Sequence, residues 1–426
     1  MATARSVAIE AVRRVVDEGA YSTRVMPALL GRTRLSERDR ALATELAFGT
    51  LRHLLGIDHA IANHATRPIR RMSPGARAAL RLGTYQLLWT RIPPHAAVSE
   101  SVALATPRER GFVNAILRRI ADEPPPLPTG RSDDDVAART GLAPWAVREL
   151  RTVLGEEAEA AAAALGEPAT LCLRANRCRT SVEALGERLV ASGRSVRGAA
   201  VHPDCLLVDG GDPARLPGFD EGWFAVQDQA SAFVTSALDP QRGDRVLDAC
   251  AGPGGKTAHI ACLIEPDGEV VAGDLHPERA ASIRSTAERL GVTVRVLAND
   301  VTRPAIRGGF DRVLIDAPCS GIGSARRRPE LLWRPRTEEL SGLARLQVRI
   351  AASAADLLRP GGRLVYSVCT FPRAETDAAC DALVRHRPAL RPLRIPGPDG
   401  SAERIRLWPH RHGSDGMFVA AFTKAE

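Results

Sequence analysis

From about residue 226 onward, short apolar runs alternate with segments of helical periodicity. The apolar runs are Arg245 to Ala249, Val270 to Gly273, Val294 to Leu297, Arg312 to Ile315 and Arg363 to Tyr366. Helical patterns, such as those at Pro277 to Leu290 and Glu338 to Leu358, separate them. This alternation predicts a parallel, Rossmann-like α/β sheet with helices on both faces. Ligands of such sheets bind where loops leave the carboxyl ends of the strands, so we expect the site there.

The first third of the chain, residues 1 to 121, shows helical periodicity throughout. Ser73-Pro74 is typical of a helix start, because serine suits the N-cap and proline suits the first turn. Ile92-Pro93-Pro94 interrupts the pattern before two further helices, at Ala97 to Leu104 and Phe112 to Ile120. We therefore expect an all-helical bundle.

A proline-rich linker, Glu123 to Gly130, follows the bundle. Helical patterns resume from Asp133 to Leu165, and strand-like pieces then appear at Thr170 to Arg174 and Cys205 to Val208. They predict a small α+β module of the ferredoxin or RRM type. The expected domains are a helical domain at 1–125, the linker with the small helical and α+β module at 126–228, and the α/β domain at 229–426.

The charge of the chain is concentrated in its first third. Residues 1 to 121 hold nineteen arginines and nine acidic residues, a net charge of +10, whereas the whole chain carries +8. A basic segment favours a polyanionic partner, because arginines that neutralise phosphates release counterions. Lysine occurs only at Lys256 and Lys424, so a bias toward arginine and a merely solvated surface is the alternative.

Composition narrows the class of protein further. The eight cysteines form no CxxC pair, which argues against a zinc ribbon or a disulfide scaffold. We expect Cys172, Cys262 and Cys380 to be small buried side chains. No run approaches the roughly 20 apolar residues of a membrane span, and the N-terminus lacks the apolar core of a signal peptide. We expect a cytoplasmic protein that binds neither a membrane nor a metal.

The first loop of the α/β region, Asp248 to Thr257, is rich in glycine. Three hypotheses about the ligand that it binds are open. A Walker P-loop would need glycine at Cys250, and a dinucleotide fingerprint would need glycine at Thr257. The third reading is S-adenosylmethionine, which brings no triphosphate. Asp274, which ends the second strand, could accept hydrogen bonds from both ribose hydroxyls. Asp300 ends the third strand, where adenine would lie.

Two cysteines occupy the ends of the next two strands. Cys319 lies in the loop Asp316 to Gly321, and Cys369 lies in Ser367 to Thr370. A free cysteine is often only a small buried hydrophobe. These two lie in tight polar loops at the ligand end of adjacent strands, so we expect them to face one crevice and to be functional.

These motifs resemble those of the NOL1/NOP2/Sun RNA (cytosine-5) methyltransferases. Asp-Ala-Cys-Ala-Gly-Pro-Gly-Gly-Lys-Thr is similar to motif I, Asp-Ala-Pro-Cys-Ser-Gly to motif IV and Ser-Val-Cys-Thr to motif VI. The helical third resembles the NusB-type RNA-binding domain at Ala79 to Leu88, Ile92 to Val98 and Gly111 to Arg119. With Val226 to Ser231 before the core, this order resembles the bacterial RsmB/Sun subgroup, which modifies 16S ribosomal RNA.

The resemblance implies an S-adenosylmethionine-dependent enzyme that forms 5-methylcytosine in 16S ribosomal RNA. We expect the protein to be a monomer. The resemblance assigns attack on cytosine C6 to Cys369 and the later release to Cys319. Hydrogen bonding at cytosine N3 would help the addition, and an acid such as Asp316 could supply it. The residues alone leave the order of the two cysteines open. The residues that the resemblance assigns to the cofactor are Cys250, Ala251, Gly252, Pro253, Gly254, Gly255, Lys256, Asp274, Asp300 and Asp316.

Arg326, Arg327 and Arg328 are expected to bind RNA phosphates, with a solvated charge run as the alternative. Lys256 is expected to hold either Asp316 or the methionine carboxylate. Three other functions stay open from the sequence: methylation of a tRNA or 23S ribosomal RNA, a non-catalytic NusB-like RNA-binding protein, and a P-loop NTPase.

Overall fold

The computed structural model describes residues 2–334 and 337–426. These described residues form two compact units. We call them the helical unit, residues 2–167 with 325–334, and the sheet unit, residues 168–324 with 337–426.

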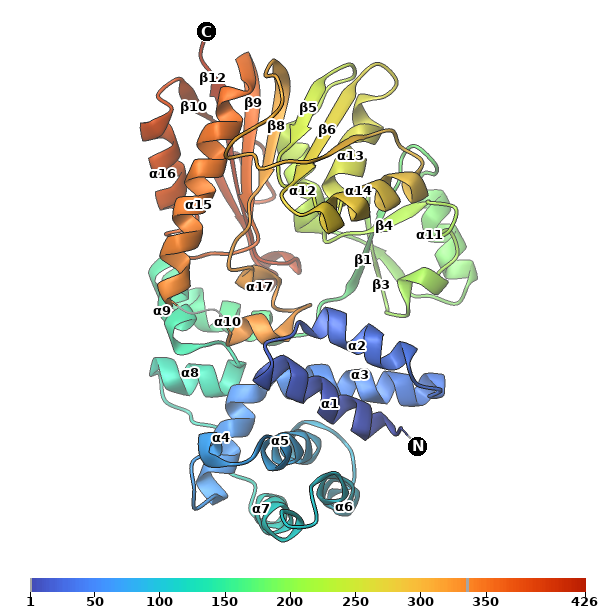
Figure 1. The fold of residues 1–426 in the computed structure, drawn as a ribbon, viewed down its shortest axis with the longest axis vertical. Helices are drawn as coiled ribbons and strands as arrows, with labels where there is room; N and C mark the ends of the chain where they lie inside the picture. Colours follow the sequence, from blue (N-terminus) through green and yellow to red (C-terminus); the bar gives the residue numbers. More distant parts are fainter. Residues whose placement is uncertain (1, 335–336) are drawn as a thin grey trace. The chain divides into compact units, whose positions relative to one another are not determined.

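The helical unit contains the predicted bundle and continues beyond it. Ser73 caps α5 by accepting a hydrogen bond from the Ala76 amide, and Pro74 occupies the first turn, as predicted. In Figure 1, α5, α6 and α7 are seen nearly end on and pack side by side. The helices are α1 (Ala4–Asp17), α2 (Ser22–Gly31), α3 (Glu37–Arg52), α4 (Leu54–His64), α5 (Pro74–Trp89), α6 (Pro94–Leu104), α7 (Arg110–Asp122), α8 (Asp133–Thr140), α9 (Pro144–Leu154) and α10 (Ala158–Gly166), with 3-10 turns η1 (Ile69–Arg71) and η2 (Gly155–Glu157).

A segment from far along the chain completes the helical unit. Residues 325–334, which include the 3-10 turn η5 (Pro329–Leu332), pack among the helices. Trp333 Nε1 donates a hydrogen bond to the Leu51 carbonyl (2.9 Å). The buried Glu330 carboxylate accepts hydrogen bonds from the Ser22 amide (3.1 Å) and from Ser22 Oγ (2.7 Å).

The sheet unit begins with a small antiparallel sheet. Among the described residues its order is β2-β3-β1-β4, and α11 packs against it. Buried apolar side chains such as Leu173, Leu185 and Phe224 form its core. The predicted ferredoxin-like α+β module is therefore present. Its elements are β1 (Leu171–Ala175), α11 (Val182–Ala191), β2 (Val196–Gly198), β3 (Cys205–Val208), η3 (Pro213–Arg215) and β4 (Phe224–Val226).

The main sheet combines the predicted parallel strands with antiparallel ones. In the part of the chain described, its order is β10-β12-β9-β8-β5-β6-β7, and β11 also pairs with β12. Five neighbouring strands, β9, β8, β5, β6 and β7, run parallel to one another. β12 runs antiparallel to β9, and β10 and β11 each run antiparallel to β12. The expected parallel sheet is thus mixed. Its strands are β5 (Arg245–Asp248), β6 (Glu269–Asp274), β7 (Arg295–Ala298), β8 (Phe310–Asp316), β9 (Leu358–Val368), β10 (Leu390–Leu393), β11 (Arg404–Leu407) and β12 (Met417–Lys424).

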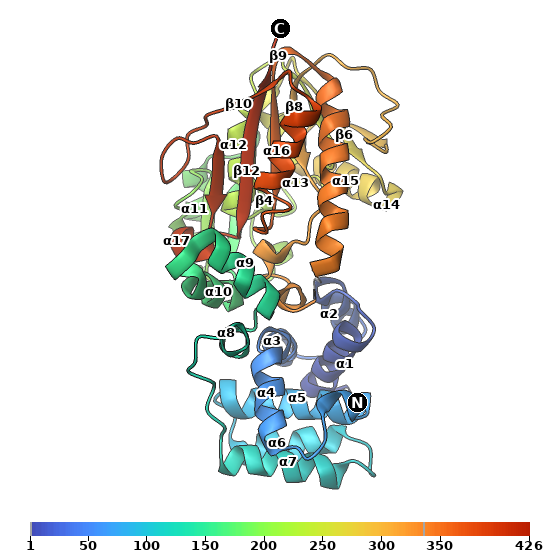
Figure 2. The same ribbon diagram turned by 90° about the vertical axis from the view of Figure 1, so that its left-hand side faces the viewer.

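Helices cover both faces of this sheet, as predicted. Successive strand residues point to opposite faces: Val246 and Leu314 pack with α12, α13 and α14, whereas Leu247 and Val313 pack with α15 and α16. Figure 2 shows the long α15 running beside the sheet, next to α16. The remaining helices are α12 (Gln229–Leu238), α13 (Gly255–Ile264), α14 (Pro277–Leu290), α15 (Thr337–Asp356), α16 (Asp377–His386) and α17 (Pro409–His412), with the turn η4 (Ile322–Ser324).

Across the described ranges, no helix has both the length and the apolar character needed to cross a membrane.

Candidate active site

The glycine-rich loop connects β5 to α13 at the carboxyl edge of the sheet. Gly254 adopts a φ of +105°, a conformation that favours glycine, directly before the helix begins at Gly255. The Gly252 amide donates a hydrogen bond to Asp274 Oδ2 (3.2 Å), and a Cβ at this position would lie 2.6 Å from that oxygen. Glycine therefore allows the loop backbone to approach the end of β6 closely.

Asp274 and Asp300 lie where the sequence analysis placed them, at neighbouring strand ends. Asp274 ends β6, is only 4% exposed, and accepts a second hydrogen bond from the His276 amide (3.0 Å). Asp300 follows β7 and is exposed. Hydrogen bonds from the Thr302 hydroxyl and amide lower the Asp300 pKa, so this carboxyl is ionised at neutral pH.

Asp248, at the end of β5, is a buried carboxyl that is only partly satisfied. Its Oδ2 accepts a hydrogen bond from Thr257 Oγ1 (2.7 Å), whereas its Oδ1 has no hydrogen-bond partner among the described residues. Burial raises the Asp248 pKa to about 7. A buried acceptor left without a donor is costly, which is consistent with a ligand that supplies one at this edge.

Lys256, on the first turn of α13, forms an ion pair with Asp316, at the end of β8. Lys256 Nζ lies 2.7 Å from Asp316 Oδ2, and Ser367 Oγ donates to Asp316 Oδ1 (3.0 Å). Burial opposes the charge on Lys256, but attraction to Asp316 outweighs it, so the Lys256 pKa is raised and the ammonium form persists. Asp316 is one of the two partners that the sequence analysis offered for Lys256.

The two cysteine loops meet at the ends of the adjacent strands β8 and β9. The Sγ atoms of Cys319 and Cys369 are 3.5 Å apart, so the structure brings the two predicted residues together. Hydrogen bonding to Cys369, burial and the nearby carboxylates of Glu375 and Asp316 hold the Cys319 pKa well above its usual range. Cys319 therefore keeps its proton more strongly than an ordinary thiol does.

The predicted cofactor residue Cys250 is half-buried in the glycine-rich loop. Burial, and then the negative charges of Asp248, Asp316 and Asp274, raise the pKa of its thiol. Cys250 is accordingly a neutral, packing side chain of the loop.

The predicted RNA-binding arginines belong to the helical unit. Arg326, Arg327 and Arg328 are half-buried, and Arg52 Nη2 donates a hydrogen bond to the Arg326 carbonyl (3.0 Å). The structure thus assigns them to the basic unit of the chain and not to the unit that holds the cysteines.

One expectation about the other cysteines is wrong. Cys262 is not a buried free thiol, because it forms a disulfide with Cys178 that joins the loop after β1 to α13. The two residues are 84 positions apart, and no local motif links them. Cys172 and Cys380 are free and buried, as predicted.

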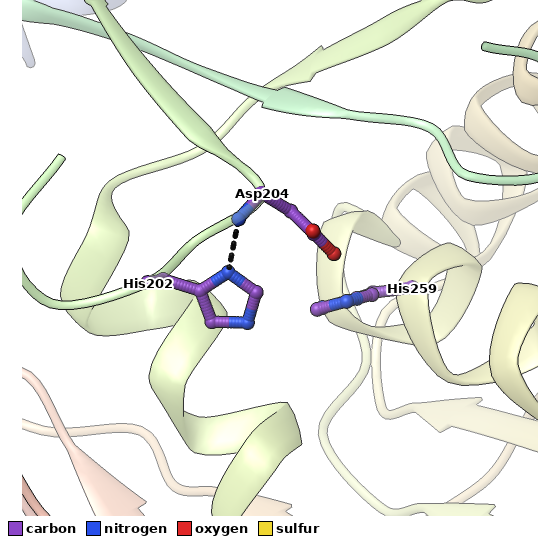
Figure 3. Close-up of side chains that lie close together, drawn as sticks. All are labelled: His202, Asp204 and His259. Carbon is purple, nitrogen blue, oxygen red and sulfur yellow. Dashed lines mark hydrogen bonds between the residues drawn. The ribbon is translucent and has the colours of Figure 1, made fainter. Parts of the chain in front are cut away.

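A cluster of potential metal ligands lies between the small module and α13. His202, Asp204 and His259 are all buried, and their ligating atoms lie within 4.8 Å of one another. Figure 3 shows the Asp204 carboxylate directed toward the His259 ring, and the Asp204 amide donating to His202 Nδ1 (3.2 Å). The neutral His202 ring therefore carries its proton on Nε2, 3.0 Å from Ser236 Oγ. Arg177 also pairs with Asp204, whereas His259 Nδ1 has no hydrogen-bond partner among the described residues. The structure therefore brings together three potential metal ligands that the sequence analysis did not single out.

The sequence analysis did not assign a role to a polar network beneath the cysteines. Ser320, Thr370, Gln347 and Glu375 are buried and hydrogen-bonded to one another. The available signal was a run of polar residues next to each cysteine and a glutamate shortly after Cys369.

The fold and the site together define a class of protein. A glycine loop enters a helix, carboxylates end successive parallel strands, and two thiols meet at the same edge. This is the arrangement of a doubly wound α/β enzyme domain with its ligand site at the carboxyl edge of the sheet.

Comparison with known proteins gives the family. Residues 235–423 match the family model of the 16S rRNA methyltransferase RsmB/F, residues 2–122 match the NusB family, and residues 143–214 match the ferredoxin-like domain of RsmF/B-like methyltransferases. A putative methyltransferase of Mycobacterium tuberculosis is 39% identical over 99% of this chain and 96% of its own length. The probable ribosomal RNA small subunit methyltransferase B of Bacillus subtilis is 33% identical, over 99% and 98%. The crystal structure of PH0851 matches with a TM-score of 0.84 at 25% identity, covering 100% of this chain and 99% of that one.

The chain therefore belongs to the RsmB/F family of 16S rRNA methyltransferases. The prediction of an RsmB/Sun-type protein with a NusB-like bundle, a ferredoxin-like module and a methyltransferase domain is confirmed.

Proposed function

We propose that the protein transfers the methyl group of S-adenosylmethionine to C5 of a cytosine in 16S ribosomal RNA. The observation that carries the proposal is the pair of thiols 3.5 Å apart at the ends of β8 and β9, within a methyltransferase fold. Membership of the family removes the P-loop NTPase from the alternatives. A non-catalytic RNA-binding protein and a methyltransferase of another RNA stay as outcomes of the test.

The residues of the carboxyl edge suit the proposed methyl donor, whose sulfonium supplies the methyl group. We assign the ribose hydroxyls to Asp274, whose carboxylate is oriented by two backbone amides. The loop from Cys250 to Lys256 would line the donor with backbone groups at the start of α13, and Asp300 would lie near the adenine. The unpartnered Oδ1 of Asp248 would accept a hydrogen bond from the polar end of the donor.

Covalent catalysis explains why a thiol is needed. C5 of cytosine is too weakly nucleophilic to take a methyl group unaided, and addition of the Cys369 thiolate to C6 makes C5 enamine-like. After methylation, a base removes the C5 proton and the bond between Cys369 Sγ and C6 breaks. We propose that Cys319 assists this release: it would first lose its own proton to solvent, after Cys369 has bonded to C6, and could then accept the C5 proton as Cys369 leaves as a thiolate. Asp316, held by Lys256 and Ser367, would support the addition by a hydrogen bond at cytosine N3.

The target base must be unpaired or flipped out to reach these groups. We assign contacts with RNA phosphates to the basic helical unit, including Arg326, Arg327 and Arg328. We propose that the protein acts as a monomer in the cytoplasm, where its ribosomal substrate is assembled.

Bisulfite sequencing tests this proposal. The purified protein is incubated with S-adenosylmethionine and ribosomal RNA from a strain that lacks the gene. A newly protected cytosine in 16S RNA is the expected result. Protection in tRNA or 23S RNA instead would change the substrate, and methyl incorporation without protection would contradict C5 chemistry. If calorimetry detects no binding of the methyl donor and no methyl group is incorporated into RNA, the protein is a non-catalytic RNA-binding protein.

A further inference from the structure

A fully buried glutamate lies beneath the two cysteine loops. Glu375 follows β9, in the loop before α16. Its Oε2 accepts hydrogen bonds from the Ser320 amide (2.9 Å) and from Gln347 Nε2 (2.9 Å), and its Oε1 accepts one from Ser320 Oγ (2.6 Å). Burial raises the Glu375 pKa above its usual value. All three groups are donors, so they act against burial and favour the ionised carboxylate.

The network of Glu375 joins the two loops through the residues that follow the cysteines. Ser320 follows Cys319, and Thr370 follows Cys369. Thr370 Oγ1 lies 2.7 Å from Ser320 Oγ; because the Ser320 hydroxyl donates to Glu375, Thr370 is the donor in this contact. A shift of Glu375 would therefore displace both loops and change the separation of the two sulphurs.

The same network is tied to the sheet and to α15. Tyr366 Oη, on β9, donates to the Glu375 carbonyl (2.7 Å), and Gln347, on α15, also donates to the Pro318 carbonyl (2.9 Å). Tyr366 and Gln347 are themselves buried. Glu375 is therefore held in place by contacts with β9 and α15, and not only by its own loop.

The charge of Glu375 needs an explanation beyond packing. Burying a carboxylate is costly, and a neutral side chain of similar volume would avoid that cost. The carboxylate contributes to the raised pKa of the Cys319 thiol. On the other side of the pair, the Lys256 ammonium interacts with Cys369, and a nearby cation favours a thiolate. Cys319 thus has a carboxylate among its neighbours, and Cys369 has an ammonium group among its own.

We infer that Glu375 is a positioning residue, which holds the two cysteine loops together and keeps the proton of the pair on Cys319, so that Cys369 is the sulphur that ionises. The proton lost by Cys369 passes to solvent, and no oxidant or reductant is involved. The inference rests on the proposed function, because it gives the two cysteines different roles in that chemistry.

Alkylation of the thiols tests the inference without RNA or methyl donor. The full-length protein is treated with iodoacetamide across a pH series, and mass spectrometry follows Cys319 and Cys369 separately. In the wild-type protein, Cys369 should react at lower pH than Cys319. In Glu375→Gln, the pH midpoint for Cys319 should fall by about one unit or more, because a neighbouring negative charge is removed. Glu375→Asp keeps the negative charge, so its Cys319 midpoint should lie close to the wild-type value.

Glu330→Gln is the matched control. Glu330 is also fully buried and also accepts from the amide and the hydroxyl of one serine, so its substitution should destabilise the fold similarly and leave both midpoints unchanged. An unchanged Cys319 midpoint in folded Glu375→Gln overturns the inference. If Glu375→Gln does not fold, the order in which the two wild-type cysteines are alkylated tests the inference. Alkylation of Cys319 at lower pH than Cys369 would overturn it. Neither result depends on whether ribosomal RNA is methylated, so failure of the proposed function is recognised separately.

Discussion

Each of the two units buries one glutamate against one serine, with different consequences. In the helical unit, Ser22 donates to Glu330, and the contact fastens the segment 325–334 among the helices. In the sheet unit, Ser320 donates to Glu375 in nearly the same geometry. The first carboxylate serves the assembly of a bundle, whereas the second lies beside a thiol.

The two units also differ in how far the hydrogen-bonding capacity of individual charged side chains is satisfied. In the helical unit, Arg81 makes two hydrogen bonds to the Asp58 carboxylate (2.8 and 2.7 Å), so both partners are satisfied. In the sheet unit, Asp248 keeps one buried oxygen without a donor among the described residues, and its pKa is strongly raised. Neither a buried charge nor an unsatisfied buried atom marks a reactive site by itself, because Arg52 Nε in the helical unit also lacks a partner among the described residues. The sheet unit differs because its buried Asp248 ends a strand at the carboxyl edge and its buried Glu375 binds the residue that follows Cys319.

The sharpest contrast between the units concerns the rate of methyl transfer. Cys369→Ala should lower the initial rate at least about a thousandfold, because the nucleophile is lost. Ser22→Ala, in the helical unit, should lower the free energy of unfolding by about 1–3 kcal/mol and leave kcat unchanged. Methyl incorporation into ribosomal RNA and urea unfolding measure the two effects. A comparable loss of kcat in both variants would remove the distinction between the units.

Asp248 should make the stability of the sheet unit depend on pH. Burial raises its pKa from 3.8 to about 7, so the folded state binds this proton more tightly than the unfolded state. The free energy of unfolding should therefore fall as the pH rises from about 4 to about 7, by up to about 4 kcal/mol. Asp248→Asn should lose this component and be more stable than wild type at alkaline pH. Parallel urea-unfolding profiles for the two proteins would contradict the assignment.

Asp274 should matter for the methyl donor and not for the bundle. Asp274→Ala should weaken binding of S-adenosylmethionine by about 10- to 100-fold, because it removes hydrogen bonds worth about 1–3 kcal/mol. Asp58→Ala removes a carboxylate of similar size from the helical unit and should leave this affinity unchanged. Calorimetry compares the variants, and equal affinity of Asp274→Ala and wild type would place the ribose elsewhere.

The smallest expected effect belongs to the helical unit. Replacing Arg326, Arg327 and Arg328 by glutamine should reduce the salt dependence of RNA binding by about two charge equivalents, because fewer counterions are released. Affinity for the methyl donor should stay as in wild type. Filter binding over a salt series measures the slope. An unchanged slope would mean that these arginines serve the packing of the helical unit.

The sequence predicted the elements whose signals are local. Apolar runs bounded by glycine and aspartate identified β5, β6, β8 and β9, and the adjacency of the last two explains why Cys319 and Cys369 meet. The strands β10, β11 and β12 were not predicted. β10 and β11 are short and carry arginines, and β10 also contains Pro392, whereas β12 is a mostly apolar run beyond the last strand that the alternating pattern included. The place of β10 and β11 in the sheet depends on pairing with β12.

Contacts between distant residues could not be predicted from local patterns. The disulfide joins Cys178 to Cys262, and Glu375 meets Ser320 across 55 positions. The segment 325–334 follows a cysteine loop in sequence but packs in the helical unit. In each case the partner is chosen by the fold and leaves no periodic signal in the chain.

Trapping the covalent intermediate tests the central claim most directly. Wild type, Cys319→Ala and Cys369→Ala are each incubated with ribosomal RNA and S-adenosylmethionine and then run on a denaturing gel. If Cys369 attacks C6 and Cys319 assists release, Cys319→Ala should give a slow-migrating protein–RNA band and Cys369→Ala none. The reverse pattern would exchange the two roles, and the absence of a band from both variants with activity retained would contradict covalent catalysis.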